Sequence, residues 1–280
     1  MPDYTIYTLV CSEEHRELLI ALLADAGMEA FEETQEVLIA YAADAVGTDW
    51  PAVFREVQQR IPFAFEARRL EQRNWNAEWE RDFAPIRIGE RLAIRASFHP
   101  PQAGVTRELV IDPKMAFGTG HHATTHMMCE LLLDYFAAQP QPQGVSVLDY
   151  GSGTGVLAIL AKQLGAQRVD AVDIEQPAYE STLENAVQNG VELNEVVHGE
   201  LSDVPIGKPY DLVLANINRN VLLASGGALY GRLRVGGTAL LSGVLAQDAA
   251  GLIDHLQQLG FRHRQTAAVD DWRAFAFERD

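Results

Sequence analysis

The sequence predicts an α/β protein. Its larger, C-terminal part is a doubly wound, mostly parallel seven-stranded sheet, preceded by a smaller α+β domain. Three observations support this fold class. From about residue 145 onward, short apolar stretches alternate with stretches of helical periodicity. The first 70 residues instead give the order strand, helix, strand, strand, helix, strand. The length of 280 residues suits two domains.

The N-terminal elements follow from residue alternation and from helix signals. Tyr4 to Val10 alternates β-branched and aromatic residues, as a strand does. Ser12 is a good N-cap for the first helix, and Gly27 ends it. We expect strands at 4–10, 28–33, 37–41 and 63–70 and helices at 12–27 and 49–60. This order is that of a ferredoxin-like domain, which we place at residues 1–70.

A linker region is predicted at residues 71–90, and a further domain at 91–280. Trp75, Trp79 and Phe83 stand four residues apart, so they share one face of a short linker helix. Such a stripe is more often core or a packing surface than a ligand site. The third segment should begin with strands at 92–98 and 108–112 and a helix at 124–138.

The regular alternation that follows defines the large sheet. We expect strands at 145–149, 168–173, 195–197, 211–216 and 238–243, with helices at 155–164, 178–189, 221–233 and 247–259. The closing strands, 262–269 and 272–278, lie too close together for a crossover helix. They should therefore form an antiparallel hairpin at one edge of the sheet.

Charge and composition limit the classes of partner. The chain has 39 acidic and 22 basic residues and a formal net charge of −17. Such a field repels nucleic acid and anionic membranes and attracts a basic partner. On composition alone, the favoured explanation of the negative net charge is that it only keeps the protein soluble. No apolar run approaches the roughly 18 residues of a membrane span, and the first residues do not resemble a secretion signal.

The two cysteines, Cys11 and Cys129, form neither a disulfide framework nor a metal-binding spacing. We expect them to be buried thiols of a cytoplasmic protein. The adjacent His121 and His122 suggest a metal, but no third ligand at suitable spacing follows. We therefore expect loop or core histidines and no metal site.

A glycine-rich turn carries the strongest chemical signal. Gly151, Gly153 and Gly155 follow an apolar strand and open a helix, and Asp173 ends the next strand. This arrangement predicts a nucleoside-containing ligand, with Asp173 accepting hydrogen bonds from ribose hydroxyls. Asp149 either holds the turn through its backbone amides or caps the strand, and we weigh the two equally.

The spacing of the turn argues against a dinucleotide. Val156 occupies the position where the dinucleotide fingerprint has glycine or alanine. The run from Gly151 to Gly155 resembles motif I of the Rossmann-like class I S-adenosylmethionine (SAM) methyltransferases. In amine methyltransferases of this kind, the end of the fourth strand carries Asn or Asp, here Asn216. Its carboxamide can accept a hydrogen bond from a substrate nitrogen and orient the lone pair.

Three segments together carry a more specific resemblance. They are Phe117-Gly118-Thr119-Gly120-His121-His122-Ala123-Thr124-Thr125, Leu214-Ala215-Asn216-Ile217 and Asn74-Trp75-Asn76-Ala77-Glu78-Trp79. With the glycine turn, the chain resembles the ribosomal protein L11 methyltransferase (PrmA) family over essentially its whole length. Gly199 to Ser202 matches the segment expected near the adenine only loosely.

The resemblance implies a set of site residues and a substrate. Thr125 and the loop of Phe117, Gly118 and Thr119 would close over SAM, and His122 would line the mouth. Gly151 and Gly153 would pass close to the cofactor, Asp173 would hold the ribose, and Ile174 would pack on the adenine. Asn216 would face the methyl group and the amine. The family methylates the α-amine and lysine ε-amines of ribosomal protein L11, a basic protein.

Other functions remain open at this point. A nicotinamide-dependent oxidoreductase would share the fold, although Val156 argues against it. A SAM-binding module without catalysis and an RNA methyltransferase are further alternatives, and the acidic composition disfavours the second. For amine methylation the acceptor must lose its proton, and no residue in the sequence identifies itself as the base.

Overall fold

The computed structural model describes residues 4–28, 30–34, 37–43, 48–69, 83–112 and 117–280. The chain divides into two compact units, Met1–Trp79 and Glu80–Asp280. The predicted linker helix, apart from Phe83, lies outside the described residues. Each unit has its own hydrophobic core.

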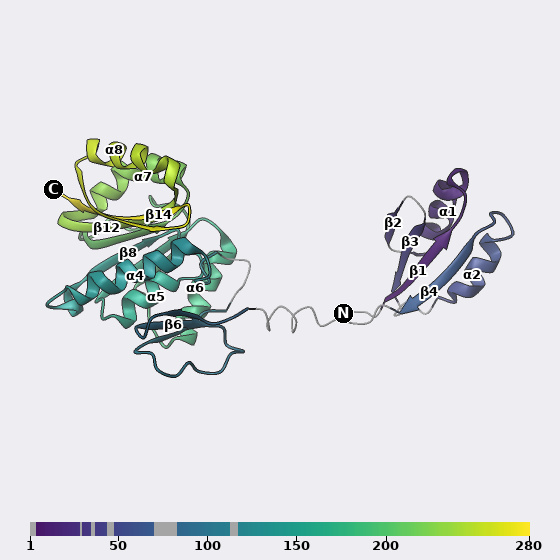
Figure 1. Cartoon of the computed structure of the whole chain (residues 1–280), viewed down its shortest axis with the longest axis horizontal. Helices are drawn as coiled ribbons and strands as arrows, with labels where there is room; N and C mark the ends of the chain where they lie inside the picture. Colours follow the sequence, from purple (N-terminus) through teal and green to yellow (C-terminus); the bar gives the residue numbers. More distant parts are fainter. Residues whose placement is uncertain (1–3, 29, 35–36, 44–47, 70–82, 113–116) are drawn as a thin grey trace. The chain divides into compact units, whose positions relative to one another are not determined.

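The N-terminal unit is a four-stranded antiparallel sheet with two helices against it (Figure 1). The sheet order β2-β3-β1-β4 has β1 and β3 in the centre, as in the predicted ferredoxin-like arrangement. Leu19 and Leu23 of the first helix and Phe54 of the second are buried against the sheet. The elements are β1 (Tyr4–Val10), α1 (Glu13–Asp25), β2 (Ala30–Glu33), β3 (Leu38–Ala43), α2 (Trp50–Val57) and β4 (Ala64–Arg69).

Two details of this unit differ from the prediction. Ser12 is the N-cap residue of α1, but its hydroxyl bonds the Nδ1 atom of His15 (2.8 Å) and not a backbone amide. Helix α2 ends at Val57, three residues early, while Asp49 caps it by accepting from the Ala52 N–H.

The C-terminal unit contains the predicted seven-stranded sheet, in the order β10-β9-β8-β11-β12-β14-β13. Strand β14 runs antiparallel to both of its neighbours, and β13 is the edge, which confirms the predicted closing hairpin. The strands are β8 (Ser146–Tyr150), β9 (Arg168–Asp173), β10 (Glu195–His198), β11 (Tyr210–Asn216), β12 (Leu233–Leu245), β13 (Phe261–Val269) and β14 (Trp272–Arg279). The order reverses between β8 and β11, and ligands bind at such a point in open α/β sheets.

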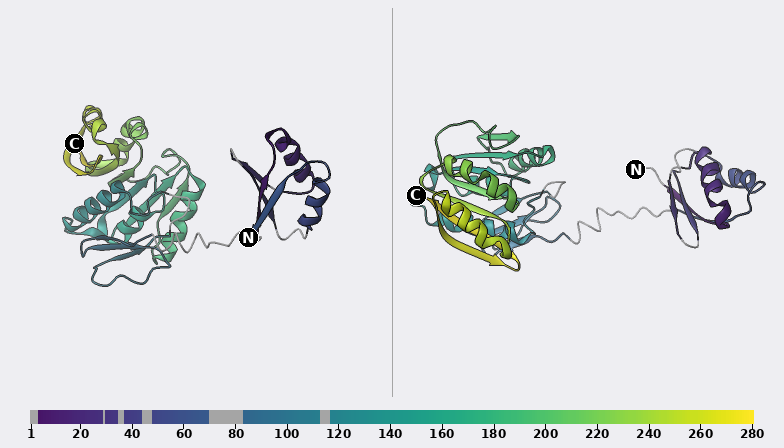
Figure 2. Two further views of the ribbon diagram at one scale, coloured as in Figure 1. Left: turned by 45° about the vertical axis from the view of Figure 1, so that its right-hand side comes forward. Right: turned by 90° about the horizontal axis from the view of Figure 1, so that it is seen from above.

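Helices cover both faces of this sheet, and each face has a core of its own (Figure 1). The helices α4, α5 and α6 pack on one face, and α7 and α8 lie side by side on the other (Figure 2). Their bounds are α4 (Ala123–Ala137), α5 (Val156–Gln163), α6 (Gln176–Gln188), α7 (Arg219–Arg232) and α8 (Ala249–Gln258), with short helical turns η2 (Pro142–Gly144) and η3 (Ala246–Asp248). Burial on both faces explains why the central strands are apolar throughout.

A small three-stranded sheet precedes α4, formed by β5 (Ile86–Ile88), β6 (Leu92–Arg95) and β7 (Glu108–Val110). Strands β6 and β7 were predicted, although β6 ends at Arg95. Strand β5 was not, because three residues give too short a pattern. Ile88, Ile94 and Leu109 bury this sheet against the core beneath α4 and α5.

Cys129 is fully buried and Cys11 partly buried, and both are free thiols. Among the helices of the described ranges, none combines the length and apolar character needed to cross a bilayer.

Candidate functional site

The glycine turn lies between β8 and α5 and needs glycine at two points. Gly151 has φ +77° and Gly153 has φ +56°, backbone conformations that other residues rarely adopt. A Cβ on Gly151 would collide with the Ile217 side chain, and one on Gly153 would collide with the Phe117 carbonyl. The turn is thus pressed between two other segments of the chain.

Asp173, at the end of β9, holds this turn from the side. Its Oδ2 atom accepts from the Gly153 N–H (2.8 Å) and its Oδ1 atom from the Glu175 N–H (3.0 Å). Each oxygen keeps a further lone pair for a ligand hydroxyl. Ile174, the next residue, lines the cavity and is 63% exposed.

Asp149 does not hold the glycine turn, so that interpretation is wrong. Its Oδ2 atom accepts from the Ala158 N–H in the first turn of α5 (3.0 Å). The helix N-cap residue is Gly155, which has no side chain to do this, so Asp149 of the preceding strand supplies the oxygen. Burial raises the pKa of Asp149 to about 7, and the charge of Asp173 adds to the increase.

Asn216 ends β11, next to the glycine turn across the sheet. Its Nδ2 atom donates to the Thr125 hydroxyl (3.2 Å), and Thr125 is fully buried in the first turn of α4. The Oδ1 atom of Asn216 is buried and has no hydrogen-bond partner within the described residues. Because a buried polar atom without a partner is costly, this oxygen is available for a ligand.

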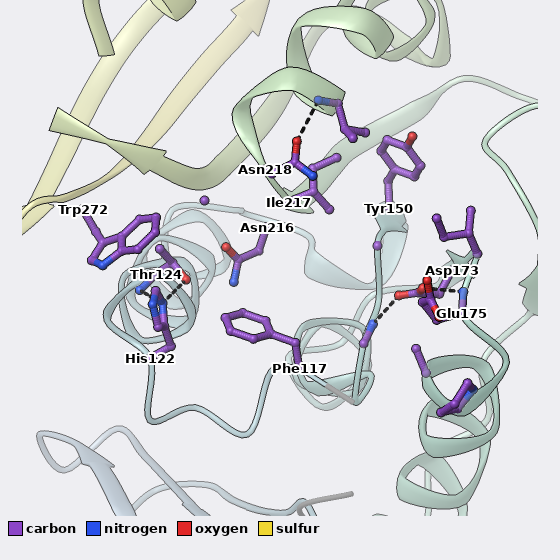
Figure 3. Close-up of a pocket in the computed structure, with 17 residues that line it drawn as sticks. Phe117, His122, Thr124, Tyr150, Asp173, Glu175, Asn216, Ile217, Asn218 and Trp272 are labelled. Atoms are coloured by element: carbon purple, nitrogen blue, oxygen red, sulfur yellow. Dashed lines mark hydrogen bonds between the residues drawn. The ribbon is translucent and has the colours of Figure 1, made fainter. Parts of the chain in front are cut away.

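Three aromatic rings surround this asparagine (Figure 3). The His122 ring lies edge-on to Trp272 (centroids 4.7 Å apart) and to Phe117 (5.3 Å). His122 is also the N-cap residue of α4, and its Nδ1 atom contacts the Thr124 hydroxyl (2.8 Å) and accepts from the Thr124 N–H (3.3 Å). Figure 3 shows the Asn216 side chain directly above the Phe117 ring, with the Trp272–His122 pair to its left.

These groups line one cavity of about 610 Å³, and we divide its wall into two sides. The glycine-turn side consists of Gly151, Gly153, Asp173, Ile174, Glu175, Pro177 and Ala178. The asparagine side consists of Phe117, His122, Thr124, Asn216, Ile217, Asn218, Val221, Gly243 and Trp272. Tyr150 also lines the cavity.

Most of the predicted site residues meet here. Phe117, Gly151, Gly153, Asp173, Ile174 and Asn216 line the cavity. Three do not line it. Thr125 lies behind Asn216, Gly118 accepts from the Thr154 hydroxyl (2.7 Å) through its carbonyl, and the Thr119 hydroxyl contacts His121 (3.2 Å).

Trp272 and Gly243 were missed by the sequence argument. Trp272 follows the two-residue turn of the closing hairpin, far from any motif, and nothing in the sequence brings it to the cavity. A signal did exist for Gly243, because it follows the residue opposite Asn216 in the parallel register of β11 and β12. A polar or small residue at a neighbouring carboxyl end belongs to the same crevice.

The two adjacent histidines both have hydrogen bonds of their own. His121 contacts the Ala84 carbonyl through Nε2 (2.9 Å), and His122 caps α4. The part of the chain that the structure describes contains no group of three or more metal-ligating side chains.

Comparisons with known proteins agree with this geometry. The family model described as ribosomal protein L11 methyltransferase (PrmA) matches residues 10–280. A ribosomal protein L11 methyltransferase of Porphyromonas gingivalis is 40% identical, over 94% of this chain and 91% of that protein. One of Bacteroides fragilis is 33% identical, over 98% of each. A crystal structure of a ribosomal protein L11 methylase from Lactobacillus delbrueckii subsp. bulgaricus has a TM-score of 0.62 at 28% identity, covering 70% of this chain and 98% of that one. The chain therefore belongs to the ribosomal protein L11 methyltransferase family and is a methyltransferase.

Proposed function

We propose that this protein transfers methyl groups from SAM to the α-amine and lysine ε-amines of ribosomal protein L11, in the cytoplasm. The observation that carries the proposal is the buried Oδ1 atom of Asn216, which has no partner in the described structure and belongs to a residue that lines the cavity beside the glycine turn. An acceptor atom in that place suits a substrate N–H.

The glycine-turn side fits the cofactor. Gly151 and Gly153 let a ligand approach the backbone closely. Both Asp173 oxygens can accept from ribose hydroxyls in addition to the two amides that they already hold. The exposed side chain of Ile174 offers an apolar surface to a purine ring. When bound, SAM supplies an electrophilic methyl group on a sulfonium.

The asparagine side fits an amine. Thr125 fixes the Asn216 carboxamide through Nδ2, which leaves the unpartnered Oδ1 atom to accept one N–H of the substrate. The nitrogen lone pair is then oriented toward the methyl group, and such in-line transfer depends on geometry more than on acid–base catalysis. A free lysine has a pKa of about 10.4, so its proton leaves before transfer, and we assign that step to water.

Charge suits a basic protein substrate. The N-terminal unit has 15 acidic and 6 basic residues in the sequence, a large share of the net −17. We propose that residues 1–70 select the substrate, that 71–90 are the linker and that 91–280 are catalytic. An acidic field steers a basic partner toward the enzyme and opposes direct binding to nucleic acid or to an anionic membrane.

The test is intact-mass spectrometry of purified ribosomal protein L11 after incubation with the enzyme and SAM. The proposal predicts added methyl groups on L11 and none on naked ribosomal RNA in a parallel assay. Methylation of the RNA alone, or binding of NAD in place of SAM, would contradict it. A chain lacking the first 70 residues should bind SAM but leave L11 unmodified, and unchanged methylation would refute the role of the N-terminal unit.

A further inference from the structure

Helix α6 carries a buried polar face directed at the glycine turn. Asn185 is only 2% exposed, and its carboxamide joins two segments that are far apart in sequence. Its Nδ2 atom donates to the Thr154 carbonyl (2.9 Å), and its Oδ1 atom accepts from the Asp112 N–H just beyond β7 (3.2 Å). Thr182, one turn earlier, donates to the Gly153 carbonyl (3.0 Å).

Thr154, in the glycine turn, forms hydrogen bonds with its carbonyl, its N–H and its hydroxyl. Its carbonyl accepts from Asn185, its N–H donates to the Phe117 carbonyl (2.9 Å), and its hydroxyl donates to the Gly118 carbonyl (2.7 Å). The residue is fully buried. One side chain of α6 and one residue of the turn thus fix the backbone that carries Phe117.

Phe117 depends on this backbone anchor. Its ring is 57% exposed and lines the asparagine side of the cavity, so burial in a core does not hold it. Its carbonyl lies so close to Gly153 that no Cβ fits there. Apart from the edge-on contact with His122 (5.3 Å), the ring is positioned by the hydrogen bonds that the Phe117 and Gly118 carbonyls accept from Thr154.

We propose that Asn185 and Thr154 are positioning residues, which fix the Phe117–Gly118 segment against the glycine turn so that Phe117 covers bound cofactor. This inference rests on the proposed function. It assigns to both residues a role in ligand affinity, in addition to any role in the stability of the fold. They act through Phe117 and the turn and do not touch the reacting atoms.

The chain provides a matched control on the same helix end. Asn189, the C-cap residue of α6, also binds the β7 backbone with both ends of its carboxamide. It donates to the Val110 carbonyl (2.7 Å) and accepts from the Val110 N–H (2.9 Å). None of its hydrogen bonds reaches the glycine turn. Loss of Asn189 should cost stability but leave the ligand site intact.

The experiment measures the dissociation constant of S-adenosylhomocysteine, the demethylated cofactor, by calorimetry on the full chain. Thr154→Val should raise this constant about tenfold, since the loss of a buried hydrogen bond is worth about that much. Thr154→Ser keeps the hydroxyl and should restore wild-type binding. Asn185→Ala should behave as Thr154→Val, and Asn189→Ala as wild type, with thermal unfolding recorded for each variant.

A double-mutant cycle tests whether the effect passes through Phe117. Thr154→Val should weaken binding much less in a Phe117→Ala background than in the wild type, because the anchor then has no ring to position. Additive effects would overturn the inference, and so would equal binding by the Val and Ser variants. If Asn185→Ala does not fold, the comparison of Thr154→Val with Thr154→Ser tests the inference by itself. A wild-type chain that binds no S-adenosylhomocysteine would refute the proposed function as well, whereas a binding wild type with an unresponsive series refutes only this inference.

Discussion

The two sides of the cavity are built in different ways. The glycine-turn side comes from one continuous part of the chain, between Gly151 and Ala178. The asparagine side is assembled from Phe117 and the start of α4, the ends of β11 and β12, the start of α7 and the start of β14. The first is a local motif, and the second exists only once the sheet has formed.

The two sides also differ in their hydrogen bonding. On the glycine-turn side, the Gly153 and Glu175 amides are already bound to Asp173. On the asparagine side, the Oδ1 atom of Asn216 has no partner in the described structure. A preformed turn suits tight binding of the cofactor, which is the same in every reaction. An acceptor atom without a partner suits a substrate that binds and leaves. We therefore expect Gly153 and Asp173 to determine cofactor binding and Asn216 and Thr125 to determine turnover, while Phe117 covers the cofactor from the asparagine side.

The largest expected effect on binding is at Gly153. Gly153→Ala should raise the dissociation constant of SAM about 100-fold, because the Cβ meets the Phe117 carbonyl and the backbone is left-handed. Gly190 has a similar φ of +63° but open space around it. Gly190→Ala should cost about 1 kcal/mol of stability and leave binding unchanged. Calorimetry with SAM checks both, and equal binding by the two variants would contradict the account.

Asp173→Asn should have the next largest effect. The amide keeps one acceptor oxygen, so either the Gly153 or the Glu175 N–H loses its partner. We expect the dissociation constant of SAM to rise about tenfold, with little change in turnover at saturating SAM. Steady-state kinetics together with a SAM-binding measurement would show whether the substitution changes cofactor affinity, turnover or both. A fall in kcat without weaker binding would show that the two sides are not separate in function.

Thr125→Val should have a smaller effect and on turnover only. The substitution removes the hydroxyl that accepts from the Nδ2 atom of Asn216 and leaves the buried volume almost unchanged. We expect kcat to fall about fivefold, as for the loss of one hydrogen bond, while SAM binding stays at the wild-type level. Thr125→Ser is the control that keeps the hydroxyl. Should the Ser and Val variants turn over equally, the Thr125 contact plays no part in catalysis.

Asp149→Asn should change pH dependence and hardly change activity. The pKa of Asp149 is raised by burial from 3.8 to about 7, so the folded chain holds this proton more tightly than the unfolded chain. Its contribution to stability is present below about pH 4 and is lost as pH rises to about 7. Cys129 stays protonated, because burial raises its pKa to about 12 and the charge of Asp149 adds to the increase.

Urea unfolding from pH 4 to pH 8 measures this effect. The stability of Asp149→Asn relative to wild type should increase by about 4 kcal/mol between those limits and level off above pH 7. A difference that does not vary with pH would mean that Asp149 does not titrate in the folded state in this range.

Much of the fold could be predicted because the local signals agree with the tertiary structure. The short apolar stretches, which alternate with stretches of helical periodicity, predicted all the strands of the large sheet in the correct order. Strand β5 of the small three-stranded sheet was missed, because it has only Ile86, Arg87 and Ile88 and is stabilised by pairing with β6 and by burial in the core. No pattern of three residues carries that information.

Only part of the site could be predicted, because one side is a local sequence motif and the other is assembled from segments that are far apart along the chain. Gly151, Gly153 and Asp173 stand at fixed distances along the chain. Trp272 reaches the cavity through the antiparallel pairing of β12 and β14. Asp149 was misjudged because the sequence places it beside the turn, whereas in the fold its carboxylate points at α5.

The central claim is that Asn216 orients the acceptor amine without contributing to cofactor affinity. The most direct measurement is the single-turnover rate of L11 methylation by Asn216→Ala at saturating SAM, with the dissociation constant of SAM measured on the same preparation. We predict a rate at least about 100-fold below wild type and unchanged SAM binding. A wild-type rate in a variant that binds SAM normally would contradict the claim.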